Sequence, residues 1–396
     1  MDKDYRNYRD AFSGQAMPFA YVDLDRFDTN VQDILARAGD TPICVATKSV
    51  RCVSLIKRIL ETSSQFHALM AFSAREAVFL AGQGFDNILV AYPVWGGAET
   101  DGLWDALRAG KQITLMVDAA AQVAHLEALA AKAGVVIPLC IDIDMSTSYP
   151  GLHFGVRRSG ITTVAAALAL WAAIQPCKNV RLDGVMGYEA QIAGLGDRIP
   201  GSPLKSAVVR WLKKKSLKEV AARRGAIVVA LRDAGCDLRF VNGGGTGSVE
   251  STCSEDVVTE VTVGSGFYSP VLFDHYEAFH HLPAAGFAIE ITRKPTPDIF
   301  TAHGGGYVAS GAPGPDRLPQ PYLPEGTALL PMEGAGEVQT PVTYTGDEEL
   351  SFGDPVFLRH CKAGELCERF NTLLLLSEGK VVDEVPTYRG EGQCFL

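Results

Sequence analysis

The sequence lacks the features that mark several classes of protein. No uninterrupted apolar stretch reaches the roughly 20 residues that a membrane-spanning helix needs. The first residues, Met1 to Arg6, lack the apolar core of a secretory signal peptide. The formal net charge is −10, and no basic block interleaved with aromatic residues opposes it. We therefore expect neither a membrane nor a nucleic acid as a partner.

Cysteine pairs at the spacing of metal or redox sites are also missing. The nine cysteines are scattered, and none of them forms a Cys-x-x-Cys motif. Several lie in apolar, strand-like stretches, which favours reduced thiols over a disulfide framework. We therefore expect a cytoplasmic protein. The sequence also contains no internal repeat and no low-complexity tract.

What the sequence does contain is a regular alternation of strand-like and helix-like segments. The eight predicted strands are the segment that ends at Lys48, then Phe66–Ser73, Asn87–Pro93, Ile113–Asp118, Leu139–Met145, Leu182–Glu189, Arg239–Gly243 and Val257–Val263. Helical patterns separate most of them. Eight strands in this alternation predict a closed (β/α)8 barrel of the TIM type, that is, an α/β fold. An open, doubly wound parallel sheet is the alternative.

The character of the sequence changes past about residue 275. Proline and glycine become more frequent, and short β-prone segments replace the helices. This composition, with its short β-prone segments, predicts a smaller antiparallel β domain after the barrel. The predicted organisation is an N-terminal segment (1–24) whose strand joins the β domain, a barrel (25–275) and a C-terminal β domain (276–396).

A lysine follows the first predicted barrel strand. Ile43–Ala46 are apolar, and Lys48 stands where this buried strand ends. A buried amine is easily held neutral, and a neutral amine is a good nucleophile. The alternative is a lysine whose long side chain simply extends to solvent.

Two loops of small residues follow the last two predicted strands. The first runs from Asn242 to Ser248 and reads Asn-Gly-Gly-Gly-Thr-Gly-Ser, and the second runs from Gly264 to Tyr268. Consecutive glycines let backbone N–H groups converge on an anion. Barrels commonly bind phosphate in these two loops. A nucleophilic lysine and a phosphate loop at one end of a barrel are the requirements for pyridoxal phosphate.

With these features the sequence resembles the fold-type III pyridoxal-phosphate enzymes, which contain an alanine-racemase-like barrel. Within them it is similar to the group of D-threonine aldolases and D-serine dehydratases. The residues that carry the resemblance are Val22–Asn30, Ala46–Lys48, Gly187–Glu189, Gly243–Ser248, Glu260–Gly264, Tyr268 and the region of His360. The resemblance also implies a homodimer in which the β domain of one subunit completes the active site of the other.

The resemblance implies roles for individual residues. Lys48 is expected to form a Schiff base with the cofactor, and Tyr188 to lie near the cofactor ring. The residues expected to bind the phosphate are Gly244, Gly245, Thr246, Gly247, Ser248, Gly264, Ser265 and Tyr268. Gln191 and His153 are predicted to contact the substrate.

An arginine close to the cofactor is also implied. We predict Arg157 over Arg158, because the arginine of the family precedes a small-residue turn into the next helix. Either arginine could instead form a structural ion pair with Asp142 or Asp144.

The match is incomplete around His360. In the metal-dependent members of the group, a histidine and a cysteine or aspartate two residues later bind a divalent ion. Here the second position is Lys362, whose ammonium group cannot bind a cation. Either His360 binds the metal with Cys361 or Glu365, or Lys362 supplies the positive charge itself. We favour the second alternative.

Together these features predict a pyridoxal-phosphate-dependent lyase that acts on a small D-configured β-hydroxy amino acid. The predicted catalytic residues are Lys48, Tyr188, His360 and Lys362. The residues do not decide between an aldolase and a dehydratase. One alternative is a racemase, whose second base would be Tyr307, Tyr322 or Tyr344 of a partner subunit. Another is a non-catalytic cofactor-binding protein, against which the β domain argues.

Overall fold

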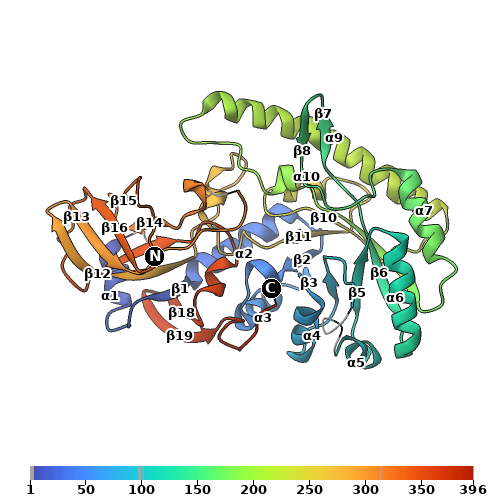
Figure 1. Cartoon of the computed structure of the whole chain (residues 1–396), viewed down its shortest axis with the longest axis horizontal. Helices are drawn as coiled ribbons and strands as arrows, with labels where there is room; N and C mark the ends of the chain where they lie inside the picture. The colour runs from blue at the N-terminus through green and yellow to red at the C-terminus, as the bar shows by residue number, and fades with distance from the viewer. Residues whose placement is uncertain (1–3, 97–99, 101, 313, 396) are drawn as a thin grey trace. The chain divides into compact units, whose positions relative to one another are not determined.

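The computed structural model describes residues 4–96, 100, 102–312 and 314–395. The chain forms two compact units, each assembled from separate segments (Figure 1). The barrel unit comprises residues 34–48, 56–264 and 395–396, and the β unit comprises residues 1–33, 49–55 and 265–394. Residues 1–3 of the predicted N-terminal segment and residue 396 of the predicted β domain lie outside the described residues.

The barrel unit is built on a closed parallel barrel. Around the barrel the strand order is β10-β11-β2-β3-β4-β5-β6-β9, and every neighbouring pair is parallel. The strands are β2 (Ile43–Ala46), β3 (Phe66–Ala71), β4 (Ile88–Val90), β5 (Ile113–Val117), β6 (Ile137–Asp142), β9 (Val180–Gly187), β10 (Phe240–Gly243) and β11 (Glu260–Val263). The predicted barrel is confirmed, and the open sheet is excluded.

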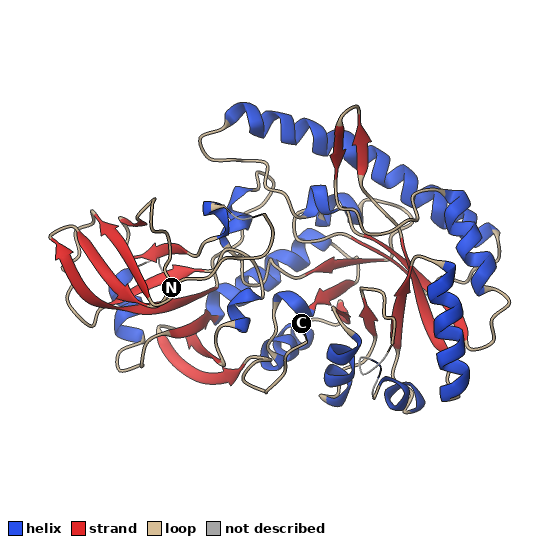
Figure 2. Cartoon of the chain, in the orientation of Figure 1, coloured by secondary structure: helices blue, strands red, loops and turns tan. Residues whose placement is uncertain are grey.

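Helices surround this barrel (Figure 2). They are α3 (Val53–Thr62), α4 (Ala74–Gly82), α5 (Leu103–Arg108), α6 (Ala120–Ala133), α7 (Val164–Ile174), α8 (Ala190–Ala193), α9 (Pro203–Asp233) and α10 (Val249–Cys253). Two of these helices are capped at the N-terminus by a side chain. The Ser73 hydroxyl accepts a hydrogen bond from the Glu76 N–H, and the Thr163 hydroxyl accepts one from the Ala166 N–H. None of the helices in the described part of the chain is both long and apolar enough to cross a membrane.

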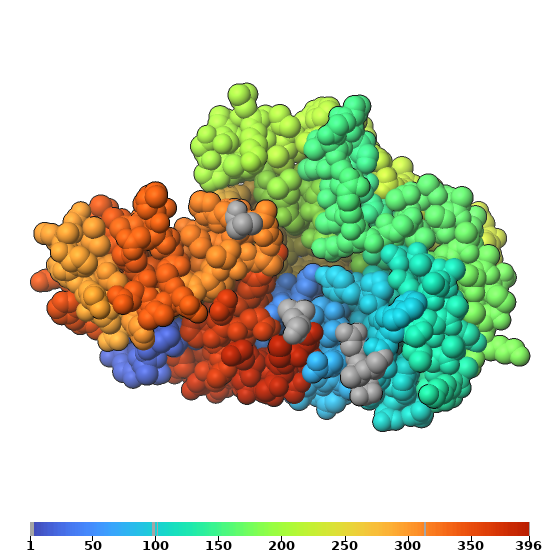
Figure 3. All heavy atoms as spheres, in the orientation of Figure 1, coloured from blue at the N-terminus to red at the C-terminus, as the bar shows by residue number. Residues whose placement is uncertain are grey.

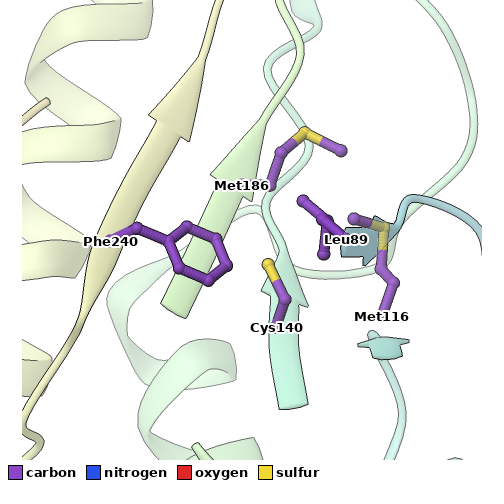
Figure 4. Packing of buried hydrophobic residues seen from close by; sticks show 5 residues of the cluster. All are labelled: Leu89, Met116, Cys140, Met186 and Phe240. Atoms are coloured by element: carbon purple, nitrogen blue, oxygen red, sulfur yellow. The ribbon is translucent and has the colours of Figure 1, made fainter. Parts of the chain in front are cut away.

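The barrel interior is rich in sulfur. Leu89, Met116, Cys140, Met186 and Phe240 form a buried cluster inside it, contributed by five different strands (Figure 4). Because strands in a closed barrel have helices on one face and the packed interior on the other, they read as continuous apolar runs. This explains why the strands were visible in the sequence.

Two features of the barrel unit were not predicted. A hairpin of β7 (Thr147–Tyr149) and β8 (Leu152–Phe154) follows β6, and α9 extends over 31 residues from Pro203. The hairpin lies against α9 on the surface (Figure 3), and the Tyr149 and Trp211 ring centroids are 6.3 Å apart. The hairpin strands have three residues each, which is too short for an alternation of polar and apolar residues to be recognised.

The β unit contains one mostly antiparallel sheet, as predicted. Its strands are β1 (Phe19–Asp23), β12 (Ala285–Thr296), β13 (Ile299–His303), β14 (Gln320–Leu323), β15 (Thr327–Leu329), β16 (Gln339–Tyr344), β17 (Pro355–Arg359), β18 (Thr372–Ser377) and β19 (Lys380–Pro386). The leading strand β1 is antiparallel to β12 and parallel to β18. Helix α1 (Tyr5–Ala11) belongs to this unit, and α2 (Leu24–Ala38) continues from β1.

The division between the units falls earlier than the predicted boundary at residue 275. The segment after Gly264 belongs to the β unit, because its backbone bonds to groups of that unit. Asn30 donates to the Phe267 carbonyl at 3.0 Å, and the Val271 N–H donates to the His360 carbonyl at 3.1 Å.

A glycine in the barrel interior generates a prediction about stability. A Cβ atom at Gly184 would lie 2.5 Å from the Phe240 ring, so Gly184→Ala overpacks the interior and should cost about 1–3 kcal/mol. The matched control is Gly225→Ala in α9, where a Cβ would meet nothing within 4 Å. It should stabilise the helix by about 1 kcal/mol. Thermal unfolding should show opposite shifts in Tm, and equal shifts would contradict the packing.

Candidate active site

The site begins at Lys48, directly after β2. The Lys48 Nζ donates a hydrogen bond to the Tyr92 hydroxyl at 3.0 Å, and it lies 5.6 Å from the centroid of that ring. The preceding residue, Thr47, is fully buried and donates to the Met70 carbonyl at 2.9 Å. This hydrogen bond joins the end of β2 to β3, so the backbone next to Lys48 is held in place.

Tyr92 and Tyr188 both lie close to one guanidinium group. The Cζ of Arg158 is 6.0 Å from the centroid of the Tyr92 ring and 5.9 Å from that of Tyr188. Burial alone would raise the pKa of Tyr92, but Lys48 and Arg158 lower it below its ordinary value. Burial raises the pKa of Tyr188 to about 12 despite the same arginine. The two phenols therefore differ in acidity.

Among the described residues, the arginine found near these two rings is Arg158, and no contact joins the predicted Arg157 to them. Both arginines are exposed, and the contact of Arg157 with the cofactor stays a prediction. The next residue, Ser159, donates to the Asp142 carbonyl at 2.6 Å and so holds the loop against the end of β6. The sequence could not fix this choice, since neighbouring residues of an irregular loop follow no period.

Asp142 is the last residue of β6 and is half-buried. Burial, together with the charge of Asp118, raises the pKa of Asp142 from 3.8 to about 7, although Arg158 acts in the opposite direction. A carboxyl group of this kind exchanges its proton near neutral pH.

The glycine-rich loop after β10 packs against Tyr188. Gly244 has a φ of 84°, and a Cβ there would lie 2.5 Å from the Val261 side chain. A Cβ on Gly245 would lie 2.9 Å from Ala193 and 3.1 Å from the Tyr188 ring. Only glycine lets the backbone come this close to the ring. Lys48, Tyr92, Arg158, Tyr188 and this loop thus form one connected set of neighbours.

The other predicted phosphate ligands of the barrel unit are buried to different degrees. Thr246 is 3% exposed, and its carbonyl accepts from Arg37 at 2.8 Å. Ser248 is 2% exposed, and its hydroxyl donates to Glu189 at 2.9 Å. Gly247 is half-buried, and Gly264 is buried directly after β11. The Ser248 hydroxyl proton is thus used by Glu189 and is not directed at an anion.

The two predicted substrate contacts have other partners. The Gln191 side-chain nitrogen donates to the Met145 carbonyl at 2.6 Å and to the Ser216 hydroxyl at 2.9 Å, and the residue is 4% exposed. His153 lies on β8, with its Nε2 3.2 Å from the Val156 carbonyl. The Gln191 nitrogen therefore connects elements of the interior, and the contacts of Gln191 and His153 with the substrate stay predictions.

Ser265, Tyr268, His360 and Lys362 belong to the β unit. The buried Tyr268 hydroxyl donates to the Val50 carbonyl at 2.8 Å, and its ring packs edge-to-face with His360 at 6.1 Å. His360 is fully buried, and neither imidazole nitrogen forms a hydrogen bond of ordinary geometry with a described residue. Burial and the neighbouring Arg359 lower the pKa of His360 to about 3, so the ring is neutral at physiological pH.

The residues next to His360 do not fit a divalent metal ion. Lys362 donates to the Ser310 hydroxyl at 2.8 Å, and the Cys361 thiol donates to the Asp316 carbonyl at 2.6 Å. Among the residues that the structure describes, no three His, Cys, Asp or Glu side chains are grouped as ligands.

Sequence reasoning missed Tyr92, Asp142 and Glu189 as site residues. Each of these residues ends or closely follows a barrel strand. Since active sites lie at the carboxyl ends of barrel strands, this position could have identified them in the sequence. Glu189 was noted only as part of the Gly187–Glu189 motif, and Asp142 only as an ion-pair partner.

A closed parallel barrel with a lysine after its first strand and a glycine-rich loop after its seventh defines the class of alanine-racemase-like barrels. The family model described as alanine racemase, N-terminal domain, matches residues 22–270, and the chain belongs to this family. The resemblance stated from the sequence is therefore confirmed.

Two relatives and one solved structure illustrate the similarity. The chain is 24% identical over 250 residues to a 3-hydroxy-D-aspartate aldolase of Paracoccus denitrificans (strain Pd 1222), covering 63% of this chain and 59% of that protein. It is 23% identical over 288 residues to a D-threonine aldolase of Arthrobacter sp, covering 71% and 69%. The D-threonine aldolase structure from Filomicrobium marinum shares the fold, with a TM-score of 0.80, 18% identity and 95% of each chain covered.

The raised pKa of Asp142 predicts a pH-dependent effect on stability. Above pH 3.8 the unfolded chain releases this proton, while the folded chain keeps it until about pH 7. The stability that Asp142 contributes therefore falls as the pH rises and is lost above about pH 7. Asp142→Asn should raise Tm more at pH 8 than at pH 5, by the equivalent of about 2 kcal/mol.

The control for this comparison is Asp105→Asn. The Asp105 side chain is 82% exposed, so its substitution should shift Tm equally at both pH values. An equal shift for Asp142→Asn as well would mean that this carboxyl ionises normally.

Proposed function

We propose that this protein is a pyridoxal-phosphate-dependent lyase that acts on a small D-β-hydroxy amino acid. The observation that carries the proposal is the Lys48 amine, held at the end of a barrel strand beside the Tyr92 hydroxyl at 3.0 Å. The names of the Paracoccus and Arthrobacter relatives support the substrate class.

The residues of the barrel unit fit pyridoxal phosphate. Lys48 offers an amine to its aldehyde, and Tyr188 offers an aromatic face to its ring. Arg158, whose guanidinium group lies close to both phenol rings, would offer hydrogen-bond donors to the cofactor. The loop has no room for a Cβ at Gly244 or Gly245, and the N–H groups of these two residues donate to Glu189 and to the Ser248 hydroxyl. The N–H groups of Thr246 and Gly247 are the ones that we expect to face the phosphate. When bound, the cofactor supplies an electron sink that weakens a bond at the substrate Cα.

The side chains around Lys48 can move protons. The Tyr92 phenol is within hydrogen-bond distance of Nζ, and its lowered pKa makes it a better acid than an ordinary tyrosine. In its phenolate form, which the lowered pKa favours, Tyr92 would take a proton from the lysine ammonium and become the phenol, and the phenol would later return that proton to the amine. Asp142, with a pKa of about 7, would donate or accept a proton near neutral pH. The roles of His360 and Lys362 at the substrate hydroxyl remain predictions from the resemblance.

Two reactions fit this site. Cleavage of the Cα–Cβ bond requires loss of the β-hydroxyl proton and gives glycine and an aldehyde. Loss of the Cα proton and of the hydroxyl group gives, after hydrolysis, a 2-oxo acid and ammonia. Racemisation is less well supported. The Tyr322 hydroxyl bonds to Arg26 at 2.8 Å, the Tyr344 hydroxyl bonds to the Glu348 N–H at 2.7 Å, and the Tyr307 hydroxyl is buried.

We also propose a cytoplasmic homodimer. The support for the cytoplasm is that all nine cysteines are free, and six of them are buried. The support for the dimer is the family resemblance, in which a partner subunit completes the site.

The test of the function is spectroscopic and then chemical. The purified protein should acquire the visible absorbance of bound cofactor, and borohydride reduction should leave the cofactor mass on the peptide containing Lys48. Lys48→Ala should lose both signals. With D-threonine, D-serine or D-3-hydroxyaspartate, an aldehyde would identify an aldolase, and a 2-oxo acid a dehydratase. Absence of the absorbance after reconstitution would refute the proposal.

Tyr92→Phe should slow the attachment of the cofactor to Lys48. Removing one positioned proton carrier costs about 10²-fold or more in rate. Mixing apo-protein with pyridoxal phosphate in a stopped-flow spectrometer measures this rate directly. Tyr149→Phe, on the β7–β8 hairpin, is the control and should leave the rate unchanged. If Tyr92→Phe attaches the cofactor as fast as the wild type, the phenol does not carry this proton.

A further inference from the structure

A buried ion-pair network lies directly behind the glycine-rich loop. It consists of Glu189, whose side chain is 1% exposed, Arg224, which is fully buried, and Glu255, which is 10% exposed. No role in the proposed chemistry has been given to these three residues. Buried charges are costly unless they are paired and hydrogen-bonded, so the network requires an explanation.

Glu189 is the centre of this network because it accepts hydrogen bonds from the loop itself. The Gly244 N–H donates to it at 3.2 Å and the Ser248 hydroxyl at 2.9 Å. The Thr252 hydroxyl, in the short helix α10 that follows the loop, donates to the same carboxylate. One carboxylate thus holds the beginning of the loop, its last residue and the helix after it.

Arg224 fixes Glu189 in turn. Its Nη2 donates to the Glu189 carboxylate at 2.8 Å and to the Gly187 carbonyl at 3.0 Å, and its Nη1 donates to Glu255. A Cβ on Gly243 would lie 2.9 Å from Nη2, so the guanidinium group is packed directly against the end of β10. Burial alone would lower the pKa of Arg224, but Glu189 and Glu255 raise it above its ordinary value. The guanidinium therefore stays charged and keeps the carboxylate in place.

We propose that Glu189 is a positioning residue for the phosphate group of the cofactor. It does not touch the phosphate. It fixes the backbone from Gly244 to Ser248, so that the N–H groups of this loop are held in place before the anion arrives. The inference rests on the proposed function, since it assumes that the cofactor is pyridoxal phosphate.

The alternative is that Glu189 only stabilises the barrel. The two roles are separated by comparing pyridoxal phosphate with pyridoxal, which has the aldehyde and the ring but no phosphate. A residue that positions the phosphate loop affects only the first ligand. A residue that merely supports the fold affects both ligands equally or neither.

The experiment uses Glu189→Gln in the full-length protein. Glutamine preserves the size, but its NH₂ group replaces one of the two carboxylate oxygens. It therefore loses the acceptor either for Gly244 and Arg224 or for the hydroxyls of Ser248 and Thr252. The dissociation constants of pyridoxal phosphate and pyridoxal are measured for the apo-protein by absorbance titration. We expect the constant for pyridoxal phosphate to rise about tenfold or more. The constant for pyridoxal should change less than about twofold.

The control is Glu219→Gln, in α9, whose side chain is 43% exposed and pairs with Arg223 at the surface. It should leave both constants unchanged. Thr252→Val keeps the shape and removes one donor to Glu189, so it should produce a smaller loss in the same direction. It also serves as the test if Glu189→Gln does not fold.

The outcomes separate the inference from the proposed function. Equal weakening of both ligands by Glu189→Gln, or no weakening of either, would overturn the positioning role. If the wild type binds pyridoxal phosphate no better than pyridoxal, the loop does not bind phosphate, and the inference fails for that reason. If the wild type binds neither ligand, the proposed function itself fails.

Discussion

The parallel pairing of β11 with β2 is the constraint on which the rest of the barrel unit depends. Val261 and Val263 are the partners of Ile43 and Val45, so the last strand lies beside the first and the barrel closes. Because all eight strands are parallel, their carboxyl ends form a single ring. Lys48, Tyr188 and Gly245, which are far apart in the sequence, thereby come to one end of the barrel.

Much of this could be predicted from the sequence. Strands buried on both faces read as apolar runs, and helices between them show their own period, so the barrel was visible. Lys48 and the loop after β10 could be found for a related reason. A lysine after a buried strand and three glycines in succession both depart from the surrounding pattern, and each departure has a direct physical meaning.

The remaining site residues could not be predicted, because their roles depend on side-chain direction in irregular segments. Arg157 and Arg158 are adjacent in a loop, and only the fold shows which guanidinium group lies close to both phenol rings. Gln191 had the right chemistry, but its amide is directed at Met145 and Ser216. Tyr92 and Glu189 interact with residues that are far away in the sequence, Lys48 and Arg224. A local sequence pattern does not reveal such contacts.

The network behind the glycine-rich loop has a consequence for the energetics of ligand capture. A loop of consecutive glycines has more conformational freedom than any other segment of equal length, and ordering it on binding would use much of the available free energy. Here Glu189 and Arg224 order the loop during folding. The conformational entropy of the loop is lost when the chain folds. The affinity for an anion is therefore not reduced by the cost of ordering the loop. A flexible sequence thus becomes a rigid, preorganised receptor.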